Sequence, residues 1–299
     1  MNTPARHRPR VIAEIRARRA MAHKPRRRRI PKQAQPLPIE REYARAIQVY
    51  VREASAVVNR EIAPMVPVWA AEQAAEVARS DALREDGLGQ RIAAYINRIA
   101  GRLLASIRPV ALDELADKFA RRTSTWNKVQ IDRQVKAAVG VDVFAAEPNL
   151  APIVDTFVAE NVALIRNVPQ QFMTNVEGIV LRGVTSGTLP RDIAEQLADE
   201  EGVAMRRAKN IARDQVGKLY GRLNAVRQQR LGVKTYTWAT VSDNRVRPEH
   251  EERDGKVYAW NPEDATDEIE YLPPEEQPGQ PINCRCGAEA NVDELLDGL

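Results

Sequence analysis

This sequence has few cysteines, few aromatic residues and no long hydrophobic run. Its two cysteines stand one residue apart, so they cannot form a disulfide framework, and we expect a protein made in a reducing cytoplasm. No segment approaches the roughly 18 consecutive apolar residues of a transmembrane helix, which excludes a membrane span. The basic N-terminus has no apolar region behind it, so we expect neither a secretory signal nor a membrane partner.

Motifs of common enzyme classes are also missing. The sequence contains no glycine-rich phosphate loop, no serine-nucleophile motif and no constellation of paired carboxylates. Aromatic residues make up only 5% of the 299 residues, and much of the 43% hydrophobic fraction is alanine, which favours helices. The length allows two domains and a sizeable core. We therefore predict the α+β class, with long N-terminal and central helices and a small β-containing C-terminal module.

Positive charge is concentrated at the N-terminus. Residues 1–32 hold twelve Lys and Arg against a single acid, Glu14, and the whole chain carries +4, so the charge is +11 there and about −7 elsewhere. Residues 1–38 also contain prolines and few apolar side chains, which predicts a disordered or partner-ordered arm. Its composition favours non-specific contact with the phosphates of double-stranded DNA, although a solubilising tail would look the same. The candidate DNA-binding residues are Arg6, Arg8, Arg10, Arg16, Arg18, Arg19, Lys24, Arg26, Arg27, Arg28, Arg29 and Lys32.

Hydrophobic residues recur every three to four positions through residues 39–147, which predicts an N-terminal region of amphipathic helices. The first helix is expected to end at Pro64, the second at Pro109 and the third at Gly140. Apolar stripes of this kind are typical of a protein core and not of a cofactor site.

A central helical region is predicted over residues 148–231. It contains a turn at residues 185–188 and then a short helix from Pro190 to about Gly202. The longest helix follows and ends at Gly232.

Three residues of this region stand out from its apolar pattern. Asn161 lies among apolar side chains and is expected to hydrogen-bond to a neighbouring element. Gly217 and Gly221 stand one helical turn apart, so they would let another helix approach closely, although glycine inside a helix costs about 1 kcal/mol against alanine.

Residues 232–299 change character and predict a small α+β module. Residues 234–241 are β-branched and aromatic, which is typical of a strand, and Asp254-Gly255 is a hairpin signal before a second strand. An acidic, proline-rich loop then leads to a short strand over residues 282–290 and to a tail helix, "DELL".

The two cysteines, Cys284 and Cys286, fall in that last predicted strand. Because alternate residues of a strand face the same side, we expect both thiols to project together and Arg285 to face the other way. His250 lies in a polar turn, and with Asp243 as a fourth ligand these residues would form a tetrahedral zinc site. The cysteines are separated by one residue instead of the two of a zinc knuckle, which leaves open the alternative that they are buried, reduced and without metal.

An enzyme is a further alternative. The sequence from His250 to Glu252, followed by Pro281 and the cysteine pair, partly matches the H-x-E and P-C-x-x-C pattern of zinc deaminases, but the second half departs from it. Charged residues around His250 are also typical of general acid–base chemistry, although such clusters in turns are more often solvated. Zinc-dependent or nuclease-like chemistry at His250, Cys284 and Cys286 is therefore the alternative function.

Four motifs of the C-terminal half occur in a defined order. They are "IARDQ" at 211–215, "WATVSDNRVRPEH" at 238–250, "DG" at 254–255 and "PGQPINCRC" at 278–286. Together they resemble the phage Mu protein F-like family of head-morphogenesis proteins. The resemblance extends over about residues 150–290 and leaves the N-terminal half uncovered. It assigns family positions to Asp243, Arg245, Val246, Arg247, His250, Asp254, Gly255, Asn283, Cys284, Arg285 and Cys286.

The resemblance implies a structural role in a tailed-phage virion and not an enzyme. Family members are minor head components that associate with the portal, and some contact DNA and influence its packaging. For this chain, the resemblance implies a minor capsid protein inside the head near the portal, made in the host bacterial cytoplasm. The implied partners are the portal protein, major capsid or scaffold proteins and double-stranded DNA. The sole candidate cofactor is the structural zinc considered above, which rests on the residues and not on the resemblance. A host nucleic-acid-binding adaptor with a basic arm is a third hypothesis.

Overall fold

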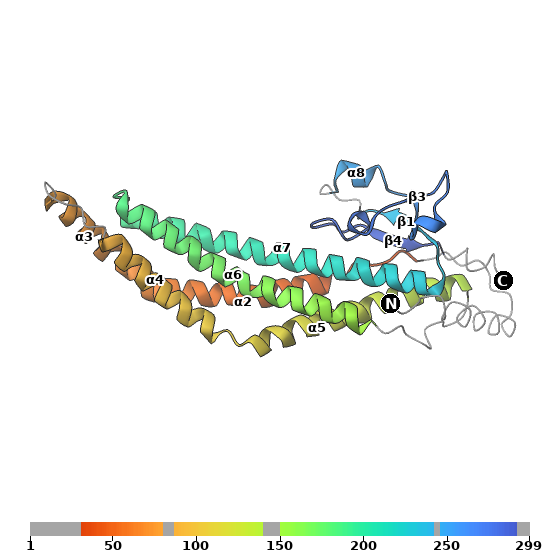
Figure 1. Cartoon of the computed structure of the whole chain (residues 1–299), viewed down its shortest axis with the longest axis horizontal. Coiled ribbons are helices and arrows are strands. Elements are labelled where there is room, and N and C mark those ends of the chain that lie inside the picture. Colours follow the sequence, from red (N-terminus) through yellow and green to blue (C-terminus); the bar gives the residue numbers. More distant parts are fainter. Residues whose placement is uncertain (1–30, 80–86, 140–149, 242–245, 292–299) are drawn as a thin grey trace. The chain divides into compact units, whose positions relative to one another are not determined.

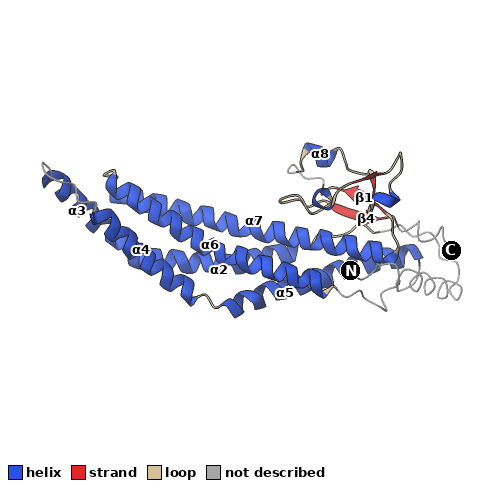
Figure 2. Ribbon diagram, in the orientation of Figure 1, coloured by secondary structure: helices blue, strands red, loops and turns tan. Residues whose placement is uncertain are grey.

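The computed structural model of the chain describes residues 31–79, 87–139, 150–241 and 246–291 (Figure 1). Long helices are followed near the C-terminus by a small sheet (Figure 2), so the predicted α+β class is confirmed. The arm up to Arg29, Asp243, Arg245 and the expected tail helix lie outside the described residues. The helices are α2 (Leu37–Val57), α3 (Val66–Arg79), α4 (Gly87–Ser106), α5 (Pro109–Val139), α6 (Ala151–Thr185), α7 (Pro190–Leu231) and α8 (Pro248–Glu251); the strands are β1 (Thr235–Ala239), β2 (Val257–Ala259), β3 (Glu270–Tyr271) and β4 (Gly287–Ala290).

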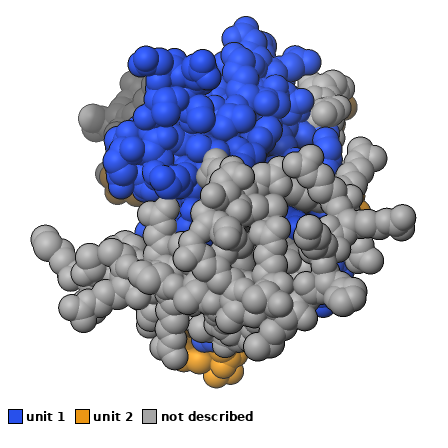
Figure 3. Space-filling model, turned by 90° about the vertical axis from the view of Figure 1, so that its right-hand side faces the viewer, with its two compact units in different colours: residues 1–40, 117–157, 213–299 blue, residues 41–116, 158–212 orange. Residues whose placement is uncertain are grey.

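The chain falls into two compact units, which Figure 3 colours separately. Unit 1 comprises the described parts of residues 1–40, 117–157 and 213–299, and unit 2 comprises those of residues 41–116 and 158–212. Each unit is therefore assembled from segments that are distant in the sequence, because α2, α5, α6 and α7 contribute residues to both. The last part of α7 and the whole sheet belong to unit 1.

The first helix of unit 2 runs past the proline that was expected to end it. Ile47 and Val51 are buried on the apolar face of α2, as predicted. Because Pro64 has no N–H to donate, the backbone widens into a π-helical turn, Val58–Ile62, and then narrows into a 3-10 turn, Ala63–Met65. The helical path then continues as α3, so the predicted end at Pro64 was wrong.

Polar side chains, buried or partly buried, tie the helices of unit 2 together. The hydroxyl of Tyr43 in α2 donates to the Oδ1 atom of Asn161 in α6 at 3.0 Å, which confirms the role expected for this asparagine. The Nε2 atom of Gln48 in α2 donates to the carbonyl oxygen of Met205 in α7 at 3.1 Å. Helix α2 is therefore joined to both of the long helices in this unit.

The predicted turn between α6 and α7 is confirmed. Helix α6 ends at Thr185, and Gly187 adopts a φ of 73°, a left-handed conformation that glycine accommodates without strain. The N–H of Thr188 donates to the carbonyl oxygen of Gly183 at 2.8 Å and closes the last turn of α6.

Helix α7 is a single helix that passes through Gly202, so the predicted end at this glycine was wrong. The nearest atom to a side chain built at Gly202 would be the Nη1 atom of Arg206, at 3.4 Å, and nothing at this point breaks the helix. Neither α7 nor any other helix in the described ranges is apolar enough over a sufficient length to cross a membrane.

The segment before α2 is ordered, so the arm expected over residues 1–38 ends earlier. Helix α2 begins at Leu37, and the side-chain amide of Gln33 is held by three side chains of α5 and α7. These partners are Gln134, Asn224 and Tyr220, at 2.9, 2.9 and 3.1 Å. The N–H of Ala34 also donates to Gln130 in α5, and its carbonyl oxygen accepts from the Trp126 indole. Residues 31–36 are therefore a fixed part of unit 1.

A four-stranded sheet, ordered β3-β2-β1-β4, forms the C-terminal module and lies beside the end of α7 (Figure 1). β1 is antiparallel to both β2 and β4, while β2 and β3 are parallel. β1 and β2 are consecutive antiparallel strands, but the connection between them is long and contains α8, so Asp254-Gly255 is the turn before β2 and not a tight hairpin; Gly255 has a φ of 77°. Polar side chains of α7 fix the edge strand, because Asn224 and Gln228 each donate to the carbonyl oxygen of Ala288 at 2.8 Å.

The continuity of α7 predicts the effect of one substitution. Gly202→Ala should raise the free energy of unfolding by about 0.5–1 kcal/mol, because alanine lowers the entropy cost of forming the helix and meets only a flexible arginine. Chemical denaturation of the two proteins would measure this. A lower stability of the variant would instead indicate that Gly202 ends a helix in a left-handed conformation.

Candidate functional site

Three candidate metal ligands meet inside the C-terminal module. The Nδ1 atom of His250 lies 3.6 Å from the sulphur of Cys284 and 3.6 Å from the sulphur of Cys286. The three ligand atoms lie within 4.8 Å of one another, and each of the three residues is only 5% exposed. The structure therefore brings together the three residues that the sequence analysis named as ligands. These residues are called the His–Cys–Cys cluster below.

The cysteines lie in a loop, contrary to the strand that the sequence predicted. Strand β4 begins only at Gly287, after both cysteines. Asn283 has a φ of 57° and turns the chain, and the N–H of Cys286 then points back to the sulphur of Cys284 at 3.4 Å. The two thiols face the same side because this loop folds around them, and not because strand residues alternate.

The loop that carries the cysteines rests on one face of α7. Asp214, Gly217 and Gly221 share this face because they are three or four residues apart. A Cβ atom at Gly217 would lie 3.0 Å from the carbonyl oxygen of Cys284, and one at Gly221 would overlap the carbonyl oxygen of Pro278. Both glycines therefore permit a close approach, as predicted, but the element that approaches is a loop and not a helix.

Hydrogen bonds hold the loop on this face. The N–H of Asn283 donates to the Oδ1 atom of Asp214 at 2.7 Å, and the Nε2 atom of Gln280 donates to the carbonyl oxygen of Lys218 at 3.1 Å. Gly279 has a φ of 88°, which lets the loop turn at the point of closest contact. Helix α7 thus fixes the position of the two cysteines relative to β1 and α8.

An aromatic side chain covers the cluster from the sheet. The fully buried ring of Trp238, on β1, packs edge-on against the ring of His250 with 5.2 Å between the centroids. Among the described residues, the buried indole N–H of Trp238 has no well-aligned hydrogen-bond acceptor. It lies beside the sulphur of Cys286 and lowers the pKa of that thiol, against the larger opposing effects of Cys284 and of burial. The guanidinium of Arg253 lies 5.3 Å from the same indole ring.

The two thiols share their ionisation unequally. The pKa of Cys284 is lowered to about 6, chiefly by the hydrogen bond between the two sulphur atoms and also by the amide N–H groups of Gly279 and Cys286. The pKa of Cys286 is raised, because that hydrogen bond and burial both favour its protonated form. The hydrogen bond between the two sulphur atoms therefore favours the thiolate form of Cys284 over that of Cys286.

The other described motif residues close the backbone around the cluster. Arg247 precedes α8, and its Nη2 atom donates to the carbonyl oxygen of Ile282 at 2.8 Å, which links the loop of His250 to the loop of the cysteines. The Oδ1 atom of Asp254 accepts the N–H of Thr240 at 2.7 Å. The N–H of Gly255 donates to the carbonyl oxygen of Trp238 at 2.8 Å. These contacts help to position the three ligands.

A small cavity borders the cluster. Its volume is about 100 Å³, and its lining includes Arg247, Asn283 and Arg285 as well as the three cluster residues. Since a water molecule occupies about 30 Å³ of liquid, the cavity holds a few waters, whereas sites for small organic ligands span about 300–1,000 Å³. Asp243, the expected fourth ligand, lies outside the described residues, so the part of the cluster that is described offers three protein ligands.

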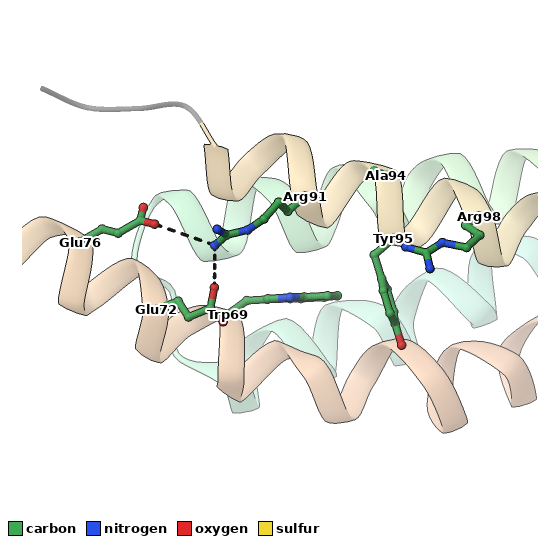
Figure 4. A pocket seen from close by; sticks show the side chains of 7 residues that line it. All are labelled: Trp69, Glu72, Glu76, Arg91, Ala94, Tyr95 and Arg98. Carbon is green, nitrogen blue, oxygen red and sulfur yellow. Dashed lines mark hydrogen bonds and ion pairs between the residues drawn. The ribbon is translucent and has the colours of Figure 1, made fainter.

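Unit 2 has a larger hollow, of about 620 Å³, between α3 and α4 (Figure 4). Arg91 forms ion pairs there with Glu72 at 2.8 Å and Glu76 at 3.9 Å, and Trp69 packs edge-on against Tyr95 at 5.6 Å. The charged groups are largely exposed and neutralise one another, as is usual for a solvated helix surface. Although this hollow is larger, its lining is therefore less indicative of a binding site than the His–Cys–Cys cluster in unit 1.

The sequence analysis named the ligands but missed residues that position them. Asp214 was noted only as part of "IARDQ", and its spacing from Gly217 and Gly221 was the available signal for a shared helix face. Trp238 was assigned to a strand without a role at the site. Of the predicted DNA-binding residues, only Lys32 is described, and it is exposed.

The fold and the site together define a class of protein: a small sheet docked on a long helix, closed around one histidine and two cysteines. The family described as "Phage Mu protein F like protein" matches residues 174–289. This stretch runs from the second half of α6 through α7 to β4 and contains the whole His–Cys–Cys cluster. The predicted resemblance to the phage Mu protein F-like family is therefore confirmed for these residues.

Comparison with curated proteins gives a relative whose match is longer than the family segment. A protein of Haemophilus influenzae (strain ATCC 51907 / DSM 11121 / KW20 / Rd), named "Uncharacterized protein", is 32% identical over 185 residues. The match covers 60% of this chain and 39% of the relative, so the chain spans well under half of that protein's length. No solved structure matches the chain.

The glycine face of α7 predicts a second stability effect. Gly221→Ala should lower the free energy of unfolding by about 1–3 kcal/mol, because the added methyl group overlaps the carbonyl oxygen of Pro278 and pushes the loop outward. Chemical denaturation would measure this, with Gly202→Ala as a matched control in the same helix. Equal stability of the Gly221→Ala variant and the wild type would contradict the close approach.

Proposed function

We propose that this protein is a structural, minor component of the head of a tailed phage and acts in head morphogenesis. The match of residues 174–289 to the phage Mu protein F-like family supports the phage origin. The localisation that follows is the virion, with synthesis in the cytoplasm of the bacterial host. Within the virion, the protein occupies the interior of the head near the portal, where the portal protein and the major capsid or scaffold proteins are its partners.

The observation that carries this proposal is the use of the motif residues within the module. The Nη2 atom of Arg247 and the Oδ1 atom of Asp254 bond to backbone groups of neighbouring turns, and the N–H of Asn283 donates to the carboxylate of Asp214 in α7. In an enzyme, residues of a functional motif typically converge on a pocket where a substrate is bound. Arg247 and Asn283 do line the cavity beside the cluster, but it is only about 100 Å³, and their hydrogen bonds hold the module's own loops and α7. This is expected for residues that maintain a rigid surface for assembly.

The size of the cavity also favours a structural protein over the enzyme alternative. The cavity of about 100 Å³ beside His250 and the cysteines is small for a nucleotide or another organic substrate. The cluster residues are each 5% exposed, so a polymer such as DNA would not reach them without rearrangement of the loops.

Contact with packaged DNA is proposed for the basic arm. Eleven of the twelve basic residues in the arm precede residue 31, while the remainder of the chain is acidic. The ordered segment at residues 31–36 attaches this arm to unit 1 through Gln33 and Ala34. The arm would neutralise phosphates without reading sequence, because it offers charge and no aromatic side chains for stacking on bases.

The assembly role predicts that the protein is present in particles. Heads purified from the phage that encodes this chain should contain it, and it should co-purify with the portal protein when the two are co-expressed. Mass spectrometry of purified heads and a cryo-electron-microscopy map of the portal vertex would measure this. Heads that lack the chain yet package DNA and remain infectious would contradict the proposed function.

The DNA contact predicts a specific change in salt dependence. Deletion of residues 1–30, which leaves the anchored segment intact, should weaken binding to non-specific duplex DNA and flatten the dependence of log affinity on log salt concentration. Each phosphate contact contributes a slope of roughly 0.9, so the loss reports directly on the charges removed. A variant with the arm residues scrambled is the matched control and should bind as the wild type does. An unchanged slope after the deletion would show that the arm does not bind DNA.

A further inference from the structure

The spacing of the three cluster atoms matches that of ligands around a single metal ion. Zinc is bound at about 2.3 Å by sulphur and about 2.0–2.1 Å by nitrogen, so tetrahedral geometry separates a sulphur from a nitrogen by about 3.6 Å. The two observed distances between the Nδ1 atom of His250 and the sulphurs of Cys284 and Cys286 are both 3.6 Å. Both nitrogen–sulphur separations therefore match those expected around one tetrahedral zinc ion.

This symmetry is not expected for a simple hydrogen bond. The Nδ1 atom of a neutral imidazole has one position for a proton or a lone pair, so it can bond one thiol well but not two at once. The Nδ1 atom of His250 is instead equidistant from the sulphurs of Cys284 and Cys286, at 3.6 Å. A central ion accounts for this arrangement, because each ligand then points at the same centre.

Hydrogen-bond donors are directed at the two sulphur atoms. The N–H groups of Cys286 and Gly279 donate to the sulphur of Cys284, and the indole N–H of Trp238 faces the sulphur of Cys286. The indole belongs to a fully buried side chain and makes no full hydrogen bond with any described residue. Such N–H groups suit thiolates, which accept hydrogen bonds strongly, and donors of this kind commonly surround metal-bound cysteine. Two thiolates side by side in a buried site repel each other unless a cation lies between them.

We propose that His250, Cys284 and Cys286 bind one zinc ion, which fastens the loop of α8 to the loop that rests on α7. Binding forms two zinc–sulphur bonds and one zinc–nitrogen bond, and the thiol protons are released to solvent. Soft thiolates with one imidazole favour zinc over magnesium or calcium, which prefer oxygen ligands. The adjoining cavity of about 100 Å³ admits a water molecule to the fourth position.

Metal analysis of the reduced, full-length protein is the first test. After purification with zinc supplied and removal of the excess by gel filtration, elemental analysis should find one equivalent of zinc per chain. A chelator strong enough to remove the zinc should lower the melting temperature and make the two cysteines reactive to a thiol reagent. In a cobalt-loaded sample, thiolate-to-metal absorption should appear. Wild-type protein that retains no stoichiometric zinc under these conditions would overturn the proposal.

Ligand variants test which atoms hold the ion. Cys284→Ser, Cys286→Ser and His250→Asn should each abolish stoichiometric zinc, and the last of these keeps a polar atom close to the position of Nδ1. Circular dichroism of α7 and the other helices would show whether each variant still folds. Retention of one equivalent of zinc in both cysteine variants would overturn the assignment.

Two tryptophans provide a matched pair that separates metal binding from folding. Trp238→Phe removes the indole N–H that faces Cys286, and the zinc affinity, measured by competition with a chelator, should fall about 10- to 100-fold. Trp260→Phe removes another buried indole from the same core, but this indole N–H donates to the Oε1 atom of Gln228 at 3.0 Å. Its zinc affinity should equal that of the wild type. Equal zinc affinities of the two variants would contradict the role of the Trp238 donor. The site itself would be contradicted by the separate result that the wild-type protein retains no zinc.

Discussion

The close approach between α7 and the loop at residues 278–284 is the contact on which the C-terminal module depends. Gly217 and Gly221 leave one helix face bare, so backbone carbonyls of the loop reach the helix directly. The carboxylate of Asp214, on the same face, then accepts the N–H of Asn283, where the chain turns. Since Cys284 follows that turn, any change that lifts the loop from α7 also moves a sulphur atom away from His250.

The module is small for an independent fold, which explains the importance of this contact. Its strands are two to five residues long, and short sheets of this kind bury too little apolar surface to be stable alone. Aromatic side chains compensate in part, because Tyr236, Trp238, Tyr258 and Trp260 form one buried group with the cysteines. Support from α7 supplies the rest, and a bound ion would join the two loops that the sheet itself does not connect.

Much of the helical structure could be predicted from the sequence, because apolar residues at three- and four-residue spacing carry the signal. The breaks were harder to predict. Pro64 and Gly202 are residues that typically end helices. A π-helical turn accommodates Pro64, and α7 continues through Gly202. The prediction that a helix packs against Gly217 and Gly221 was also wrong. The spacing of the two glycines indicates a close approach but does not indicate which kind of element approaches. The cysteines and His250 were recognised as a set, whereas their positioning by Asp214 and Trp238 depends on contacts across the chain that no local pattern contains.

The anchored segment at residues 31–36 has a mechanical consequence. Gln33 is clamped by Gln134 and Asn224, and the same Asn224 side chain holds the Ala288 carbonyl of the edge strand. A pull on the chain ahead of residue 31 would therefore be borne by α5 and α7, and Asn224 would pass part of the force to the sheet. Tension from a polymer bound at the N-terminus would therefore act on β4, the strand that follows the two cysteines.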